Sequence, residues 1–343
     1  MDHLFLMKRI IDEGKPPRKP SRTSILAVKQ RQRERALQIK TILVPLDFSP
    51  ASLQALKYTI PLAKEFGSTV HLVHVQPVDE LTAIENAGGL MLNCADAIAL
   101  MQDRLSEALS TQGGFWPDNC HVVSGRPFEE ICKLAGRIEA NLIVLPTRGR
   151  GRLKHVLLGS TAERVVRYAS CPVLIPHGAG FKSITWNGNS GMTGFKLRKI
   201  LVPVDFSPCS MAGVRYAARL ASTTGGTLRL FHVVFPYTQV FALDRVGADL
   251  TPLATTAKAT AREQMKELTG MNFLRDIPCE TQIQIGRVID EIVGESGDPA
   301  IDLVVTSTHG TSGFKRAFIG SVAEQVVRYA NCPVMTVPSR GCP

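Results

Sequence analysis

The chain has 343 residues, of which 44% are hydrophobic and 20% are charged, and its formal net charge is +10. This length suits two domains of ordinary size, each able to bury its own core. No apolar run approaches the roughly 20 residues that a membrane helix needs, which argues against a transmembrane protein.

The first 38 residues carry ten basic and four acidic side chains, so they hold most of the positive balance. We expect this segment, 1–38, to be a basic extension that is flexible or partly helical. Such an arm can bind nucleic acid or an anionic surface. A plain solvated extension is an equal interpretation, because no aromatic residues alternate with the charges. The segment also lacks the basic, apolar and cleavage-site order of a signal peptide.

The cysteines form no CxxC pair and no regular framework. They are Cys94, Cys120, Cys132, Cys171, Cys209, Cys279, Cys332 and Cys342. Because paired ligand spacing is absent, we predict neither a metal site nor a redox centre. Buried thiols in a reducing compartment fit this pattern, and we expect a cytoplasmic location.

The first predicted element after the extension is a strand over 41–46, a continuous apolar run typical of a strand buried on both faces. Asp47 ends it. Ser49 and Pro50 then predict the start of a helix that runs through Ala63, because serine caps free amides and proline suits the first turn. Gly67 is expected to close that helix.

Strands and helices then alternate along the chain. The sequence predicts strands over 69–75, 119–125, 141–147 and 172–176, with helices over about 95–109, 128–138 and 161–169. The strands recur over 199–204, 228–234, 280–286, 301–307 and 333–337. This alternation predicts a parallel sheet with helices on both faces. Residues 178–195 hold five glycines and no clear period, so we interpret them as a linker.

The chain repeats itself at domain length. Residues 147–176 and 308–337 match closely, and twelve of fifteen positions are identical from Gly159 and Gly320 onward. A repeat of this length indicates a duplicated domain and not a solenoid. We therefore predict one domain over 39–177, a second over 196–339 and a short tail over 340–343.

Ligands of open parallel sheets bind beyond the carboxyl ends of the strands, where the winding direction reverses. In the first copy this rule brings together Asp47, the turn after Val75, Gly125 and the loop over 147–160. In the second copy the corresponding features are Asp205, the turn after Val233, Gly286 and the loop over 308–321.

Each loop has two glycines ten positions apart, and a serine follows the second. These residues are Gly149, Gly159 and Ser160 in the first copy and Gly310, Gly320 and Ser321 in the second. Glycine lets a main chain approach a ligand closely, and the start of a helix favours an anion. The spacing therefore suits a polyphosphate.

A purely structural interpretation is equally open at this point. Ser160 with Glu163, and Ser321 with Glu324, have the spacing of a capping box, which would only start a helix. An aspartate after a strand also often caps the turn that follows.

The combination of LVPxDFS in the first strand, a glycine-x9-GS loop after the fourth, and AExVVRxAxCPV near the end resembles the universal stress protein family. The resemblance covers about 40–177 and 196–339. It implies two tandem Rossmann-like α/β domains, each an open five-stranded parallel sheet with helices on both faces. Many members bind ATP, while others have lost the site.

The resemblance also implies roles for individual residues. Asp47 and Asp205 would contact the nucleoside, and the main chains of Val75 and Val233 would meet the adenine. The phosphates would be held by Gly149, Gly159 and Ser160 in one copy and by Gly310, Gly320 and Ser321 in the other. The expected ligand is ATP or another adenine nucleotide, with Mg²⁺ as an optional companion.

Both copies depart from the family at the first glycine of the loop, which is Pro146 in one and Ser307 in the other. Proline has no amide hydrogen and fixes φ, whereas serine keeps its amide. We therefore predict that the second copy binds nucleotide better than the first.

The sequence supports a nucleotide-binding stress regulator, with two alternatives. One is a slow ATP hydrolase, although no Walker loop or catalytic dyad is visible. The other is an assembly module with degenerate sites. The last strands, 172–176 and 333–337, should lie at sheet edges and pair with each other within the chain as a pseudo-dimer. The sequence leaves a further homodimer open.

Overall fold

The computed structural model describes residues 37–76, 99, 103, 119–146, 158–176, 184–187, 191–234, 251–308 and 320–339. Residues 1–36 and 340–343 lie outside these ranges. Leu37, which falls within the extension predicted over 1–38, is buried because its apolar side chain joins the core. Among the described residues, no helix is long and apolar enough to cross a membrane.

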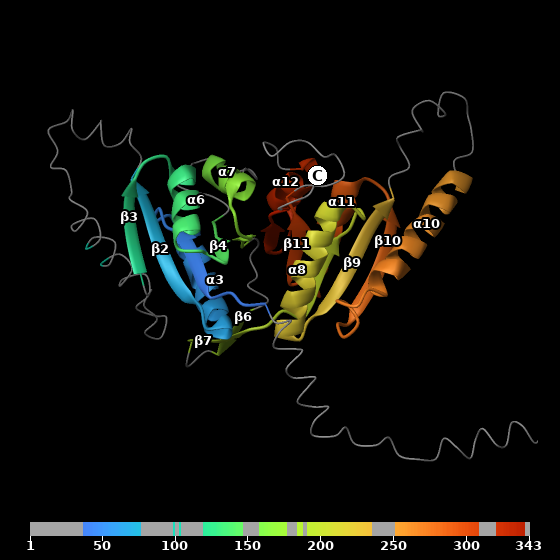
Figure 1. Ribbon diagram of the computed structural model, residues 1–343, viewed down its shortest axis with the longest axis horizontal. Helices are drawn as coiled ribbons and strands as arrows, with labels where there is room; N and C mark the ends of the chain where they lie inside the picture. The colour runs from blue at the N-terminus through green and yellow to red at the C-terminus, as the bar shows by residue number, and fades with distance from the viewer. Residues whose placement is uncertain are drawn as a thin grey trace, which may run out of the picture. The chain divides into compact units, whose positions relative to one another are not determined.

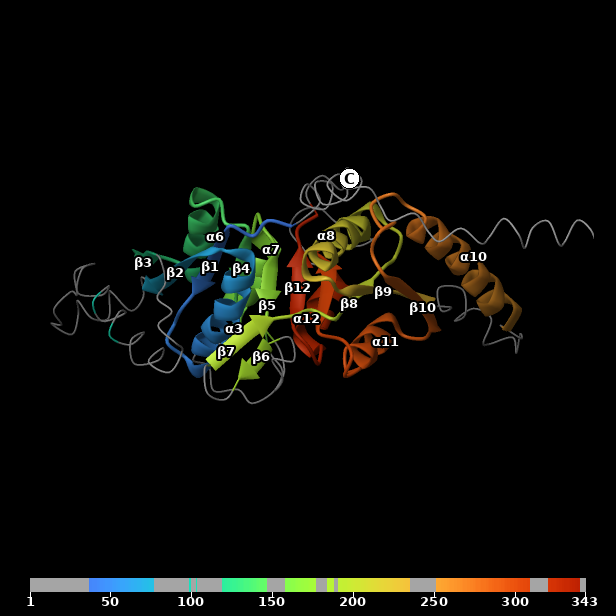
Figure 2. The same cartoon turned by 90° about the horizontal axis from the view of Figure 1, so that it is seen from below.

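The first copy forms a parallel half-sheet (Figure 1), whose strand order β3-β2-β1-β4-β5 can be followed in Figure 2. Its elements are β1 (Thr41–Pro45), α3 (Pro50–Phe66), β2 (Thr69–Gln76), β3 (Asn119–Ser124), α6 (Pro127–Arg137), β4 (Leu142–Val144), α7 (Ser160–Tyr168) and β5 (Val173–Ile175). The predicted fold class is confirmed. Most of the helix expected over about 95–109 lies outside the described residues.

The second copy repeats this arrangement in the order β10-β9-β8-β11-β12. Its elements are β8 (Lys199–Pro203), α8 (Pro208–Thr224), β9 (Thr227–Val234), α10 (Thr251–Thr269), β10 (Cys279–Ile285), α11 (Val288–Glu295), β11 (Leu303–Ser307), α12 (Ser321–Tyr329) and β12 (Val334–Val337). Figure 2 shows α8 and α11 on opposite faces of these strands.

The first helix of each copy starts and ends for the same local reasons. Ser49 Oγ accepts the amide of Ser52 at 3.2 Å, and Pro50 occupies the first turn of α3. Gly67 then closes the helix at φ 62°, a left-handed conformation that glycine adopts without steric cost. The predicted start is confirmed. The helix continues past Ala63 to Phe66, directly before this glycine.

The half-sheets join at their last strands. β5 and β12 pair antiparallel, with Val173 opposite Thr336, Leu174 opposite Met335 and Ile175 opposite Val334. All of these residues are buried. The pairing gives each last strand a hydrogen-bonding neighbour on the side that would otherwise be an open edge.

The linker contains structure that the sequence analysis did not predict. β6 (Ile184–Asn187) and β7 (Gly191–Phe195) form an antiparallel hairpin. Phe195 packs edge-on against Tyr58 of α3, with ring centroids 5.9 Å apart, and both rings are buried. The Gly188-Asn189-Ser190 run between two stretches of β-formers was a turn signal in the sequence.

Two apolar layers cover the sheet. One packs α3, α8 and α10 against one face, and the other packs α6, α7, α11 and α12 against the opposite face. Strand residues alternate between the layers, as Val44 and Leu43 do in β1. The carboxyl ends of the strands are thereby fixed on a rigid frame.

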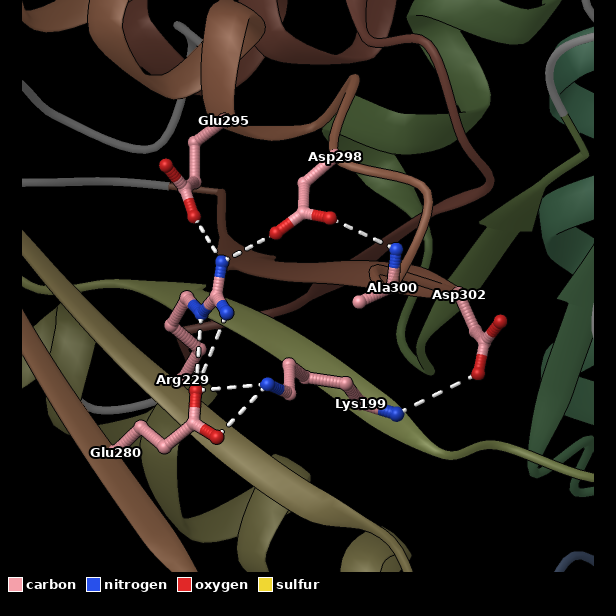
Figure 3. A network of polar contacts seen from close by, with 7 residues as sticks. All are labelled: Lys199, Arg229, Glu280, Glu295, Asp298, Ala300 and Asp302. Atoms are coloured by element: carbon pink, nitrogen blue, oxygen red, sulfur yellow. Dashed lines mark hydrogen bonds and ion pairs between the residues drawn. The ribbon is translucent and has the colours of Figure 1, made fainter.

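The two copies differ at the amino-terminal end of the sheet. In the second copy, Arg229 of β9 binds the carboxylates of Glu280, Glu295 and Asp298 (Figure 3). Burial alone lowers the pKa of this guanidinium, but the three hydrogen-bonded carboxylates outweigh it and raise the pKa overall. Lys199 adds a 2.8 Å contact to Glu280.

In the first copy the register places His71 and Asn119 where the second has Arg229 and Glu280. The ring of His71 stacks on that of His121, and Nδ1 of His71 lies 3.0 Å from Nε2 of His121. Burial, then the charges of His71 and Arg137, lower the pKa of His121. Where the second copy has a network of charged side chains, the first copy therefore has a pair of histidines.

Candidate functional site

The candidate site of each copy lies where the sheet reverses its winding direction. In the second copy β8 has β9 on one side and β11 on the other, so the carboxyl ends of three adjacent strands meet there. Asp205 follows β8, Val233 is the second-to-last residue of β9, and Ser307 is the last residue of β11. Asp47, Val75 and Pro146 have the same places in the first copy. The predicted site residues of each copy come from distant segments of the sequence, and they lie together at the carboxyl ends of the strands.

The two aspartates hold the turn between the first strand and the first helix. Oδ1 of Asp47 accepts the amide of Ser49 at 3.0 Å, and Oδ1 of Asp205 accepts that of Ser207 at the same distance. Asp205 also accepts the Ser207 hydroxyl at 2.6 Å. The structural role considered for these carboxylates is therefore real, and it fixes one oxygen of each in place.

The residue after each aspartate has an unusual backbone conformation. Phe48 and Phe206 have φ values of 59° and 61°. A side chain of this size in the left-handed region costs about 1–2 kcal/mol, so surrounding contacts must impose it. Neither phenylalanine was predicted from the sequence to have a special conformation.

A histidine from the neighbouring strand supports each turn. Nδ1 of His74 lies 2.7 Å from the carbonyl oxygen of Leu46, and Nδ1 of His232 lies 2.7 Å from that of Val204. The His74 ring contacts Phe48 at 5.3 Å between centroids. The His232 ring contacts Phe206 at 4.7 Å. Their recurrence 26 positions after each phenylalanine was a signal available in the repeat.

The main chains of Val75 and Val233 extend beyond the first strand of their copy. Pairing of β1 with β2 ends at Pro45 and Val73, and pairing of β8 with β9 ends at Pro203 and Phe231. Each valine thus lies two residues past the last strand pair on that side. Val73 and Phe231 accept from the first strand, and main-chain groups alternate in direction along a strand, so those of Val75 and Val233 point to the same side.

The glycines at the third strand have a neighbour that explains them without a ligand. A Cβ added at Gly286 would lie 2.3 Å from Oε1 of Glu291, and one at Gly125 would lie 2.8 Å from Cγ of Glu130. Gly125 also has φ 150°. These glycines make room for a glutamate of the following helix, so packing accounts for them at least as well as binding does.

The start of α12 is tied to the end of β11. The amide of Gly320 donates to the carbonyl oxygen of Thr308 at 2.8 Å, and the amide of Thr308 donates to Val337 at 3.1 Å. The first of these bonds occupies the amide of Gly320, a residue expected from the sequence to hold phosphate. Gly149 and Gly310, assigned to the same task, lie outside the described residues.

The capping-box interpretation is wrong in both copies. The N-caps are Gly159 and Gly320, so Ser160 and Ser321 are the first helical residues and not the caps. Glu324 turns toward Arg328, 2.9 Å away, instead of reaching back to the cap. Both serines are exposed. A hydroxyl in the first turn, beside amides that have no intrahelical acceptor, remains available to an anion.

The strand before the loop is paired over a shorter length in the first copy than in the second. β11 pairs with β12 up to Ser307, whereas β4 pairs with β5 only up to Val144. Amides alternate in direction along a strand, and those of Val304 and Thr308 point to β12. The intervening amide of Ser307 therefore faces the β8 side. Pro146 has no hydrogen at that position.

The described residues contain no group of three or more side chains suited to hold a metal ion. The six described cysteines are free thiols, and burial raises the pKa of Cys132 to about 11. Their chemistry does not contribute to the edge described above.

This architecture defines a tandem of doubly wound α/β domains, each with a topological switch point at the carboxyl ends of its strands. A sequence model of the universal stress protein family matches residues 38–177 and 196–338, which is most of the chain. The chain belongs to the universal stress protein family.

Individual relatives agree with this assignment. Universal stress protein MJ0531 of Methanocaldococcus jannaschii is 36% identical over 141 residues, covering 40% of this chain and 81% of the relative. A universal stress protein of Mycolicibacterium smegmatis is 28% identical over 201 residues, covering 59% of this chain and 63% of the relative. The match thus spans less than two thirds of the mycobacterial protein.

One solved structure shares the fold over most of the chain, and a second is similar in sequence over a shorter part. A universal stress protein from Archaeoglobus fulgidus has a TM-score of 0.58 at 20% identity, covering 88% of this chain and all of that one. A universal stress protein solved in complex with cAMP has a TM-score of 0.29 at 23% identity, covering 41% of this chain and 98% of that one.

Proposed function

We propose that this protein binds an adenine nucleotide, ATP in the first instance, and acts as a stress-response regulator whose partner choice depends on occupancy. One observation carries the proposal. Ser321 stands exposed in the first turn of α12, outside the cap position, and the Gly320–Thr308 bond holds that turn at the carboxyl end of β11.

The residues fit such a ligand. The amides of the first turn of α12 and the Ser321 hydroxyl are donors for phosphate oxygens, and the helix dipole favours their charge. Asp205 would meet the nucleoside, and the Val233 main chain would meet the base. Gly310 and Gly286 remain candidate phosphate and crevice residues, and Mg²⁺ could accompany the phosphates. The phosphates of ATP would supply negative charge, and the first-turn amides of α12 and the Ser321 hydroxyl would donate hydrogen bonds to it.

The second copy is the better candidate site. Ser307 retains a backbone amide on the β8 side of its strand, whereas Pro146 has no amide hydrogen at the matching position of the first copy. Hydrogen bonds to charged groups contribute about 1.5–3 kcal/mol each, so one missing donor weakens affinity about tenfold or more. The first copy, with Asp47, Val75, Gly125, Gly149, Gly159 and Ser160, would be the weaker site.

Calorimetric titration of the full chain with ATP, ADP and cAMP tests this function. We expect Ser321→Ala to weaken the tighter binding event about tenfold. Ser160→Ala, the matched change in the other copy, should leave that event unchanged. Absence of binding heat at millimolar nucleotide would refute the proposal and favour the alternative of an assembly module joined through β5 and β12. ATP turnover above that of Ser321→Ala would favour the slow hydrolase.

A further inference from the structure

Among the features that the proposed function leaves unused, the one that recurs with the same geometry in both copies is the histidine beside the aspartate turn. His74 and His232 are half-buried, and each immediately precedes the valine expected to meet the base. Neither was singled out by the sequence. Each ring stands between two apolar residues of its strand, Val73 and Val75 in β2 and Phe231 and Val233 in β9.

The hydrogen bond fixes the chemistry of the ring. A carbonyl oxygen can only accept, so Nδ1 of His232 carries the proton that it donates to Val204 at 2.7 Å. Val204 is the residue directly before Asp205. The bond therefore anchors the peptide from which the aspartate extends.

The contacts continue from the histidine to the first helix. The ring of His232 lies against Phe206, whose left-handed backbone turns the chain after Asp205. Asp205 then accepts from Ser207, and Ser207 Oγ accepts the Ser210 amide of α8 at 3.1 Å. One strand residue thus braces a strained turn from both sides of the aspartate. The first copy has the same series from His74 to Ser52.

We propose that His232, and His74 in the first copy, are positioning residues that hold the aspartate carboxylate at the nucleoside end of the crevice. The effect on binding rests on the proposed function, whereas the effect on the turn does not. A purely structural role would instead spread any loss over the domain, without a particular dependence on Asp205.

The first test needs no ligand. Asn places its amide nitrogen close to where Nδ1 stands, whereas Gln places it one bond further out. We expect His232→Gln in the full chain to speed hydrogen exchange of the Ser207 amide about tenfold, and His232→Asn to change it less than about twofold. The Ser49 amide in the unmodified copy is the internal control. Equal exchange in all three proteins, or a change shared by Ser49, would overturn the proposal.

The second test is a double-mutant cycle in ATP affinity, combining His232→Gln with Asp205→Asn. If the histidine acts through the aspartate, each change alone weakens binding about tenfold and the pair weakens it no more than Asp205→Asn does. Fully multiplicative losses would overturn the proposal. No binding by the unmodified protein would refute the proposed function, and the exchange test would still decide the role of His232.

Discussion

Removing the charge of Arg229 should destabilise the second copy strongly. Its side chain is 15% exposed, as is that of Glu295, while Asp298 and Glu280 are 34% and 48% exposed. Removing one partner of a buried ion pair costs about 3–5 kcal/mol because the other charge stays uncompensated. Here two of the three carboxylates can regain water, so we expect Arg229→Met to cost about 3 kcal/mol, the lower end of that range.

Native-state hydrogen exchange resolved by peptide is the suitable assay, because it reports the two copies separately. Peptides of β9, β10 and α11 should exchange roughly 100-fold faster in Arg229→Met, the equivalent of about 3 kcal/mol. Arg126→Met is the control. Its pair with Glu129 is a surface contact, with the arginine side chain 78% exposed, and should matter by less than about 0.5 kcal/mol.

The reasoning can be refuted by a second substitution. The first copy has Leu134 at the helix position that Glu295 occupies in the second. If the cost arises from a stranded carboxylate, Arg229→Met combined with Glu295→Leu should recover about half of the loss. A double variant no more stable than the single one would show that the stranded charge is not the cause.

Three further predictions follow from the differences between the copies. The pKa of His121 is lower in the folded than in the unfolded chain, so the unfolded chain binds more protons and the stability of the first copy should fall as pH drops below about 6.5. In hydrogen-exchange measurements from pH 7.5 to 5.5, His121→Gln should remove this loss of stability. Pro146→Ser should tighten ATP binding by the first copy about tenfold in calorimetry, and an unchanged affinity would contradict the role given to that amide. Gly226→Ala should lower the free energy of urea unfolding by about 2–3 kcal/mol, because its Cβ would lie 2.6 Å from the Leu197 carbonyl oxygen. Gly286→Ala should lower it by less than about 1 kcal/mol, because the Glu291 side chain can rotate away.

The sequence was sufficient for the fold because the repeat, the buried strands and the helix caps all point to the same alternation. Ser49, Pro50 and Gly67 act as their residue types predict. It was insufficient where the outcome depends on a contact between distant segments. The bond from His74 to Leu46 spans 28 residues, and a left-handed phenylalanine has no local sequence signal.

The serine after the loop shows a different limit. A Gly-Ser-x-x-Glu segment can start its helix at either of the first two residues, and both choices satisfy helix propensity. The chain makes glycine the cap, and Glu324 pairs with Arg328 instead of the helix start. One residue of difference decides whether the hydroxyl serves the helix or can face a ligand.

The two copies allow an internal comparison of what each end of the sheet requires. At the amino-terminal end of the sheet, the second copy has the network around Arg229 and the first copy has a pair of histidines. Two different sets of contacts are therefore compatible with that end. At the carboxyl-terminal end they keep the same aspartate turn, the same left-handed phenylalanine and the same histidine bond of 2.7 Å. Packing alone would not favour a strained backbone twice, since a glycine would relieve it. The shared strain therefore argues that both turns are built to present the aspartate, even in the copy where Pro146 removes a donor beside it.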